Sequence, residues 1–147
     1  MKKIVLLITF AFSLSLSVQS QYEKGMTKAF DLWEQGKSTE AANLFERIAK
    51  AEKSNWIPYY YAGYVNIMSA FGMKEEAKLQ TQLEKVSDYL DNALLLSPKN
   101  AEIMIMKALK NTAYIAFDGQ KYGMSLSAKN TAIYEEAIQI APNNPRV

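Results

Sequence analysis

The stretch YLDNALLLSPKNAE, residues 89–102, occurs again in altered form as IYEEAIQIAPNNPR, residues 133–146. Three residues recur with a constant offset of 44 positions: Ala93, Pro98 and Asn100 return as Ala137, Pro142 and Asn144. A sequence period of about 20 to 50 residues is typical of proteins built from stacked copies of one small unit. The stretch therefore predicts that the chain uses one structural unit more than once.

An earlier segment shows what this unit is. In AFDLWEQGKSTEAANLFERIAK, residues 29–50, apolar residues recur at three- and four-residue spacing on both sides of Gly36, as expected for two amphipathic helices. Glycine commonly ends a helix, and serine commonly caps the start of one. We therefore expect a helical hairpin that turns at Gly36, with Ser38 capping its second helix.

The rest of the chain has helix signals only, and no stretch alternates with the period of two that a strand requires. Asn55 and Asn100 are positioned to cap two further helices, and Pro58 is tolerated in a first turn. Asp118-Gly119 is expected to break the chain before a last helix. We predict an all-α fold of six helices in three hairpins, the last four helices covering Asn55 to Gly72, Lys74 to about Leu96, Ala101 to about Phe117, and part of Ser125 to Ile140.

These features resemble the tetratricopeptide repeat, a helix-turn-helix unit of about 34 residues. The first hairpin matches the family pattern best, although Ile48 replaces an alanine and Lys53 stands where proline is usual; the matching residues are Ala29, Leu32, Gly36, Ala41 and Phe45. The resemblance implies a right-handed α-solenoid with repeats at about 22–55, 56–100 and 101–144. The second and third repeats are longer than the family unit. Their extra residues either lengthen a helix or enlarge a loop around FDGQKYGMS, residues 117–125.

The same resemblance implies a binding groove, because the first helix of each repeat lines the concave face of the solenoid. The candidate groove residues are Phe30, Trp33, Tyr60, Tyr61, Tyr64, Met68, Ile105 and Met106. Tyrosine, tryptophan and methionine suit a binding surface, but simple packing explains the same spacing. On the other face of the third helix, Ala62-Gly63 is expected to let the next helix approach closely.

The chain begins with two lysines, a short apolar run and small polar residues, which is the layout of a secretory signal peptide. We expect cleavage after Ser20 and export to the periplasm or the cell exterior, with residues 21–147 forming the helical domain and no stable membrane anchor. Cleavage removes Lys2 and Lys3 from the 17 basic residues, which leaves 15 against 15 acidic residues. A neutral chain of this kind is not expected to bind nucleic acid.

The sequence contains no histidine and no cysteine. This excludes Ser-His and Cys-His nucleophilic sites, histidine-ligated haem and ordinary zinc sites. The acidic pairs Glu75-Glu76, Asp88 with Asp91, and Glu135-Glu136 lie among polar neighbours, where a solvated charge is the usual state. We therefore expect no enzymatic activity, no catalytic residues, no cofactor and no metal.

The leading functional prediction is an exported interaction scaffold that binds a protein or peptide segment in the groove. One alternative is a small-ligand pocket lined by Tyr60, Tyr64, Tyr114, Phe117 and Tyr122. A further alternative is that the chain is the N-terminal fragment of a longer solenoid. The last helix carries Ile133, Ile138 and Ile140 without a polar cap, so self-association through this end is also expected.

Overall fold

The computed structural model describes residues 21–147, and the signal peptide predicted for residues 1–20 lies outside this range. The described part of the chain is helical and contains no strand, which confirms the all-α part of the predicted fold class. Its helices cover residues 21–34, α2 (Ser38–Ala51), α3 (Ile57–Ala70), α4 (Glu76–Leu96), α5 (Ala101–Phe117) and α6 (Gly119–Ile140).

Local signals in the sequence set most of the helix ends. Gly36 has a φ of 77°, the left-handed conformation that glycine adopts most easily, and it separates the 21–34 helix from α2. The Asn55 side chain accepts the N–H of Ile57 at 3.0 Å, and that of Asn100 accepts the N–H of Glu102 at 3.0 Å. Both asparagines thus satisfy backbone donors that a helix start leaves free. The expected cap at Ser38 is wrong, since this residue is the first of α2 and Lys37 precedes it without a side-chain cap.

The largest difference from the sequence prediction is the start of α6. Only Asp118 separates α5 from α6, which begins at Gly119 instead of near Ser125. The Asp118 carboxylate accepts the N–H groups of Gln120 at 3.0 Å and Lys121 at 2.9 Å. An aspartate cap of this kind outweighs the low helix propensity of the glycine that follows it. Most of the FDGQKYGMS segment is therefore helix, and the extra residues of this hairpin lengthen α6.

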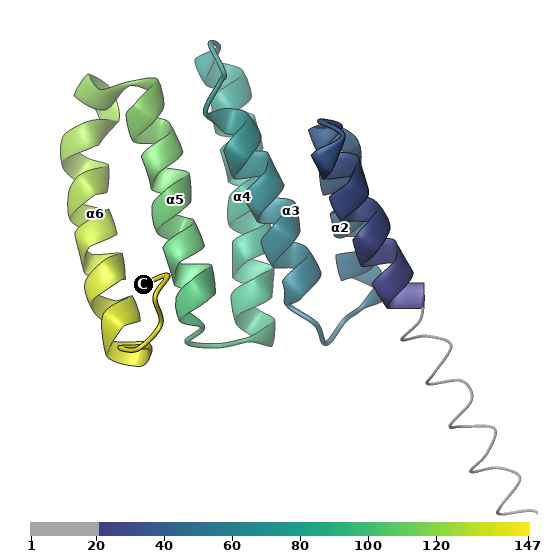
Figure 1. Ribbon diagram of the computed structural model, residues 1–147. Coiled ribbons are helices and arrows are strands. Elements are labelled where there is room, and N and C mark those ends of the chain that lie inside the picture. The colour runs from purple at the N-terminus through teal and green to yellow at the C-terminus, as the bar shows by residue number, and fades with distance from the viewer. Residues whose placement is uncertain (1–20) are drawn as a thin grey trace, which may run out of the picture.

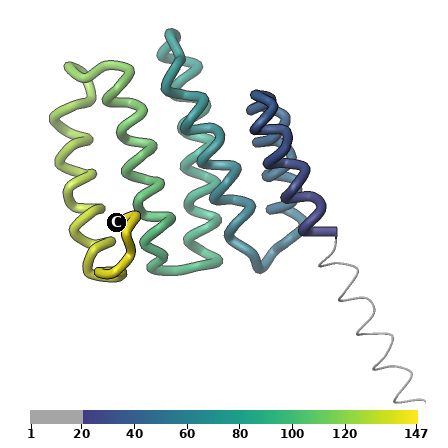
Figure 2. Tube along the Cα trace, in the orientation of Figure 1, coloured from purple at the N-terminus to yellow at the C-terminus, as the bar shows by residue number. Residues whose placement is uncertain are grey.

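The helices lie side by side in chain order, and successive helices run in opposite directions (Figures 1 and 2). The central helix α3 packs against α2, α4 and α5, whereas α6 packs mainly against α5. The 21–34 helix and α2 therefore lie at one end of the row, and α6 lies at the other (Figure 1).

Two apolar clusters hold the described helices together. One cluster lies among α3, α4 and α5, and its largest fully buried members are Ile67, Leu79, Leu83, Val86, Leu90 and Ile103. The other lies between the 21–34 helix, α2 and α3, and it contains the buried ring of Phe45. At Gly63 a Cβ atom would lie 3.2 Å from Cδ2 of Leu90. The close approach expected at Ala62-Gly63 is therefore present.

Candidate functional site

A line of large side chains follows one face of α3. Trp56, Tyr60, Tyr64 and Met68 are spaced four residues apart, which places them on the same side of the helix. The rings of Trp56 and Tyr60 meet edge to face with centroids 5.7 Å apart, and those of Tyr60 and Tyr64 stack at 6.5 Å. Trp33 from the 21–34 helix meets Tyr64 edge to face at 5.3 Å. We call these five residues the aromatic stripe.

The stripe is only partly covered by the protein. Its four rings are half-buried, and Met68 is 43% exposed. Among residues 21–147, the hydroxyls of Tyr60 and Tyr64 bond to no protein group, and no buried polar side-chain atom lacks a partner. These hydroxyls are therefore not fully buried. The stripe combines a preformed apolar surface with hydrogen-bonding groups at its edge, a combination that favours protein interfaces.

Two other residues predicted for the groove contribute mainly to the core. Phe30 lies 5.1 Å from Phe45 and 4.7 Å from Tyr61 between ring centroids. Tyr61 in turn stacks on Phe45 at 5.6 Å, and Phe45 is fully buried. The rings of Phe30 and Tyr61 thus fill the space between the 21–34 helix, α2 and α3.

The two groove residues predicted on α5 differ from each other. Ile105 is half-buried, whereas Met106 is 2% exposed and belongs to the core cluster of α3, α4 and α5. The side chain of Met106 therefore offers no surface to a partner in this structure. Adjacent helical residues differ by about 100° in direction, which is why neighbouring positions can have opposite roles.

Three residues of this region were not predicted from the sequence as part of the site. Trp56 lies four residues before Tyr60, so its spacing alone could have placed it in the stripe. Glu102 and Arg146 gave no such signal, because they are far apart in the chain. The Glu102 carboxylate accepts the Asn144 side-chain amide at 2.8 Å and lies 3.3 Å from the Arg146 guanidinium. The segment after α6 turns back and ends beside α5 (Figure 1).

The Glu102 and Arg146 pair influences the pKa of Tyr60 in the stripe. Burial raises the pKa of the Tyr60 hydroxyl above its ordinary value, the Glu102 carboxylate raises it further, and the Arg146 guanidinium opposes the change. The phenol of Tyr60 therefore stays neutral near pH 7. Glu102 lies in the first turn of α5, which packs against α3, and Arg146 is paired with Glu102, so both charges lie near the stripe.

A separate polar cluster joins α2 to α4. The Glu46 carboxylate accepts hydrogen bonds from Lys50 at 2.7 Å, Lys85 at 2.8 Å and the Tyr89 hydroxyl at 2.5 Å. Bonds from Lys50, Lys85 and Tyr89 lower the pKa of Glu46 to about 2. Burial, with the hydrogen bond to Glu46, raises the pKa of Tyr89 to about 12. This cluster stabilises the packing of α2 against α4 and leaves no titrating group near neutral pH.

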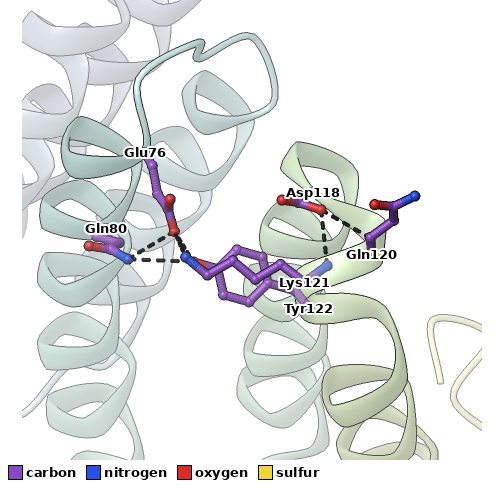
Figure 3. Close-up of polar contacts among 6 residues, drawn as sticks. All are labelled: Glu76, Gln80, Asp118, Gln120, Lys121 and Tyr122. Carbon is purple, nitrogen blue, oxygen red and sulfur yellow. Dashed lines mark hydrogen bonds and ion pairs between the residues drawn. The ribbon is translucent and has the colours of Figure 1, made fainter.

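A comparable cluster joins α4 to α6 (Figure 3). The Glu76 carboxylate accepts hydrogen bonds from Lys121 and from the Tyr122 hydroxyl, and from the Gln80 amide at 3.2 Å. The ring of Tyr122 lies 5.1 Å from that of Tyr114 on α5. The added first turns of α6 thus supply the residues that reach back to α4.

The alternative pocket receives little support from the surface. The surface of the described part of the protein includes hollows of about 150 to 480 Å³. Of the five residues proposed to line one pocket, only Phe117 lines any of these hollows, and it does so at a site of about 250 Å³ with Phe71 and Met73. Tyr122 and Tyr114 pack on each other as described above.

Three of the six acidic residues considered for catalysis are paired with lysines. Glu75 lies 2.7 Å from Lys78, and Asp91 lies 2.8 Å from Lys107, in addition to the pair of Glu76 with Lys121. In the range 21–147, no three acidic side chains gather where they could hold a metal ion. No helix in that range has the length and apolar character needed to cross a bilayer.

No protein-family model matches the chain, and searches of curated proteins and of solved structures found no match either. The aromatic stripe is the surface whose composition and exposure best support a function. Its chemistry is that of contact and hydrogen bonding, with phenols and indoles at its surface.

Proposed function

We propose that this protein is a non-enzymatic interaction module that binds an extended protein segment along the aromatic stripe. The observation that carries the proposal is the mutual contact of four half-exposed rings, two of which hold hydroxyls free of protein partners. Rings already fixed by their neighbours lose little conformational freedom when a partner covers them. The binding energy would come from apolar burial, with the hydroxyls bonding to the partner's backbone.

The proposed architecture behind this site is a short right-handed α-solenoid of tetratricopeptide-like hairpins. The hairpins are the 21–34 helix with α2, α3 with α4, and α5 with α6. One observation supports the repeat: α3 packs on α5, the corresponding helix of the next hairpin. In such a solenoid, the first helices would form the concave face, and the stripe would lie on it.

The predicted signal peptide also indicates where the protein would act. We infer that the protein acts in the periplasm or outside the cell, after cleavage behind Ser20. Mass spectrometry of the protein purified from its natural source tests this inference. The proposal requires a chain that starts at Gln21, and an intact N-terminus would contradict it.

A second candidate function is self-association through α6. Four large apolar residues of this helix are exposed, namely Met124 at 92%, Tyr134 at 38%, Ile138 at 49% and Ile140 at 37%. Tyr134 and Ile138 are four residues apart and lie on the same side of the helix, and adjoining exposed apolar residues are typical of a contact surface. Analytical ultracentrifugation over a range of concentrations tests this candidate. A mass that rises with concentration supports it, and a strict monomer at high concentration contradicts it.

The binding proposal is tested with an exposed member of the stripe, so that folding is preserved. The mature chain and its Met68→Lys variant would be used to capture proteins from the envelope and secreted fractions of the natural source. Leu95→Lys is the matched control, because Leu95 is 78% exposed on α4 and lies outside the stripe. We expect a specific partner that wild type and Leu95→Lys retain and Met68→Lys loses. Equal capture by Met68→Lys would contradict the proposal.

A further inference from the structure

The segment that follows α6 folds back onto α5 and is held there by one side chain. Glu102 receives the Asn144 amide at 2.8 Å on one carboxylate oxygen and the Arg146 guanidinium at 3.3 Å on the other. Asn144 also accepts the backbone N–H of Arg146 at 3.0 Å, which forms a tight turn. The turn thus presents an arginine side chain to the acid.

Glu102 has a position that suits recognition. It lies in the first turn of α5, the helix that packs beside the stripe-bearing α3, and its side chain is 23% exposed. A carboxylate shielded to this degree loses part of its hydration, so it needs a cation or a hydrogen-bond donor nearby. Arg146 supplies this cation in the folded-back arrangement.

Arg146 is held weakly enough to be replaced. Its side chain is 74% exposed, and its contact with Glu102 is a single bond of 3.3 Å. Exposed ion pairs of this kind contribute little to stability. A basic side chain on a bound segment can therefore take the same position.

We propose that the segment bound by the aromatic stripe carries an arginine or lysine that replaces Arg146 on Glu102, so that residues 141–147 act as an internal competitor for the site. This inference rests on the proposed function and specifies it. Glu102 selects for a basic residue, and the stripe selects for the apolar residues beside it.

The test is a selection of random peptides displayed on phage, carried out on the mature chain with Arg146→Ala. We expect the selected peptides to contain arginine or lysine next to apolar residues. Synthetic copies of the selected peptides should bind the wild-type chain several-fold more weakly than they bind the Arg146→Ala variant. The reason is that residues 141–147 compete with the peptides in the wild-type chain. Adding Glu102→Gln to Arg146→Ala should weaken binding about tenfold, since a charge-assisted bond is lost.

Two controls make the result specific. Glu40→Gln removes an exposed acid from the first turn of α2, and Glu102→Gln removes a half-buried acid from the corresponding turn of α5. Glu40→Gln should leave peptide binding unchanged. Replacing the basic residue of the peptide with glutamate tests the same contact without altering the protein, and it should abolish binding.

The possible outcomes separate the two proposals. Peptides that lack a basic preference, but still require Tyr60 and Tyr64, would overturn the inference and leave the proposed function in place. Equal binding by the basic peptide and its glutamate variant would do the same. Peptides whose binding does not depend on Tyr60 or Tyr64 would overturn both.

Discussion

Helices α4 and α6 are nearly equal in length, with 21 and 22 residues, but they are buried to very different degrees. α4 buries six side chains, among them Leu83 and Leu90, whereas α6 buries only Asn130 and Ala137. α4 packs between α3 and α5 and is joined to α2 through Glu46, while α6 packs mainly on α5. Position in the row, and not helix length, therefore decides how much a helix contributes to the core.

The comparison also indicates where binding surfaces can occur. A helix covered by neighbours on both sides stabilises the fold, and a helix face without a neighbour remains free for contact. Helix α3 has both kinds of face, since one side carries Gly63 against Leu90 and another carries the half-exposed rings of the stripe.

The largest expected effect is the loss of a buried side chain from α4. Leu90 is fully buried, so Leu90→Ala should lower the free energy of unfolding by about 2–5 kcal/mol. Ile138 on α6 is 49% exposed, so Ile138→Ala should change it by less than about 0.5 kcal/mol. Urea denaturation of both variants measures the difference. Similar losses at the two positions would contradict the comparison.

A smaller effect is expected where α3 approaches α4. Gly63→Val places branched carbon atoms where a Cβ alone would already lie 3.2 Å from Leu90 and 3.9 Å from Val86. Overpacking of this kind should cost about 1–3 kcal/mol of the free energy of unfolding. Thermal denaturation followed by circular dichroism checks this, and an unchanged melting temperature would show that α3 and α4 are less closely packed.

The link between α2 and α4 predicts a pH dependence. Because the pKa of Glu46 is lowered from 4.5 to about 2, its contribution to stability is complete above pH 4.5 and is lost as the pH falls toward 2. Above pH 4.5, the free energy of unfolding of Glu46→Gln should therefore be about 1–2 kcal/mol lower than that of wild type. This figure is reduced for solvent screening. Urea denaturation across this range should show the gap closing at low pH, and a constant gap would exclude the charge as its cause.

A small effect of opposite sign is expected within α6. Gly123 lies within α6, and no atom lies within 4 Å of the position of an added Cβ. Gly123→Ala should therefore raise the free energy of unfolding by about 0.5–1 kcal/mol, because alanine favours a helix more than glycine does. A loss of stability in the same denaturation measurement would mean that another molecule or segment packs there.

Local signals predicted much of the fold. The bounds of α5 match those expected, and the Asn100 cap forms as predicted, because both depend on neighbours within a few residues. The cap expected at Asn55 is wrong by one residue, since Trp56 directly precedes α3 and Asn55 bonds the N–H of Ile57 from one position earlier. The start of α6 was missed because Asp118 acts as a cap instead of a breaker, and the Asp-Gly pair is compatible with both roles.

The candidate site was less accessible to sequence reasoning. Helical spacing identified Tyr60 and Tyr64 as one face, but it did not reveal whether Met106 or its neighbour Ile105 is the buried one. The contact between Glu102 and Arg146 joins residues 44 positions apart, and no local pattern indicates it. Such contacts depend on how the hairpins pack.

The stripe contains both tryptophans of the sequence, Trp33 and Trp56, so tryptophan fluorescence reports on it directly. The decisive measurement is a titration of the mature chain with each selected peptide while this emission is recorded. We expect a saturable change, and a loss of affinity in Tyr60→Ala/Tyr64→Ala but not in Tyr134→Ala, with folding verified by circular dichroism. Peptides that bind without changing the emission, and equally to the folded double variant, would contradict the proposal that the stripe is the binding site.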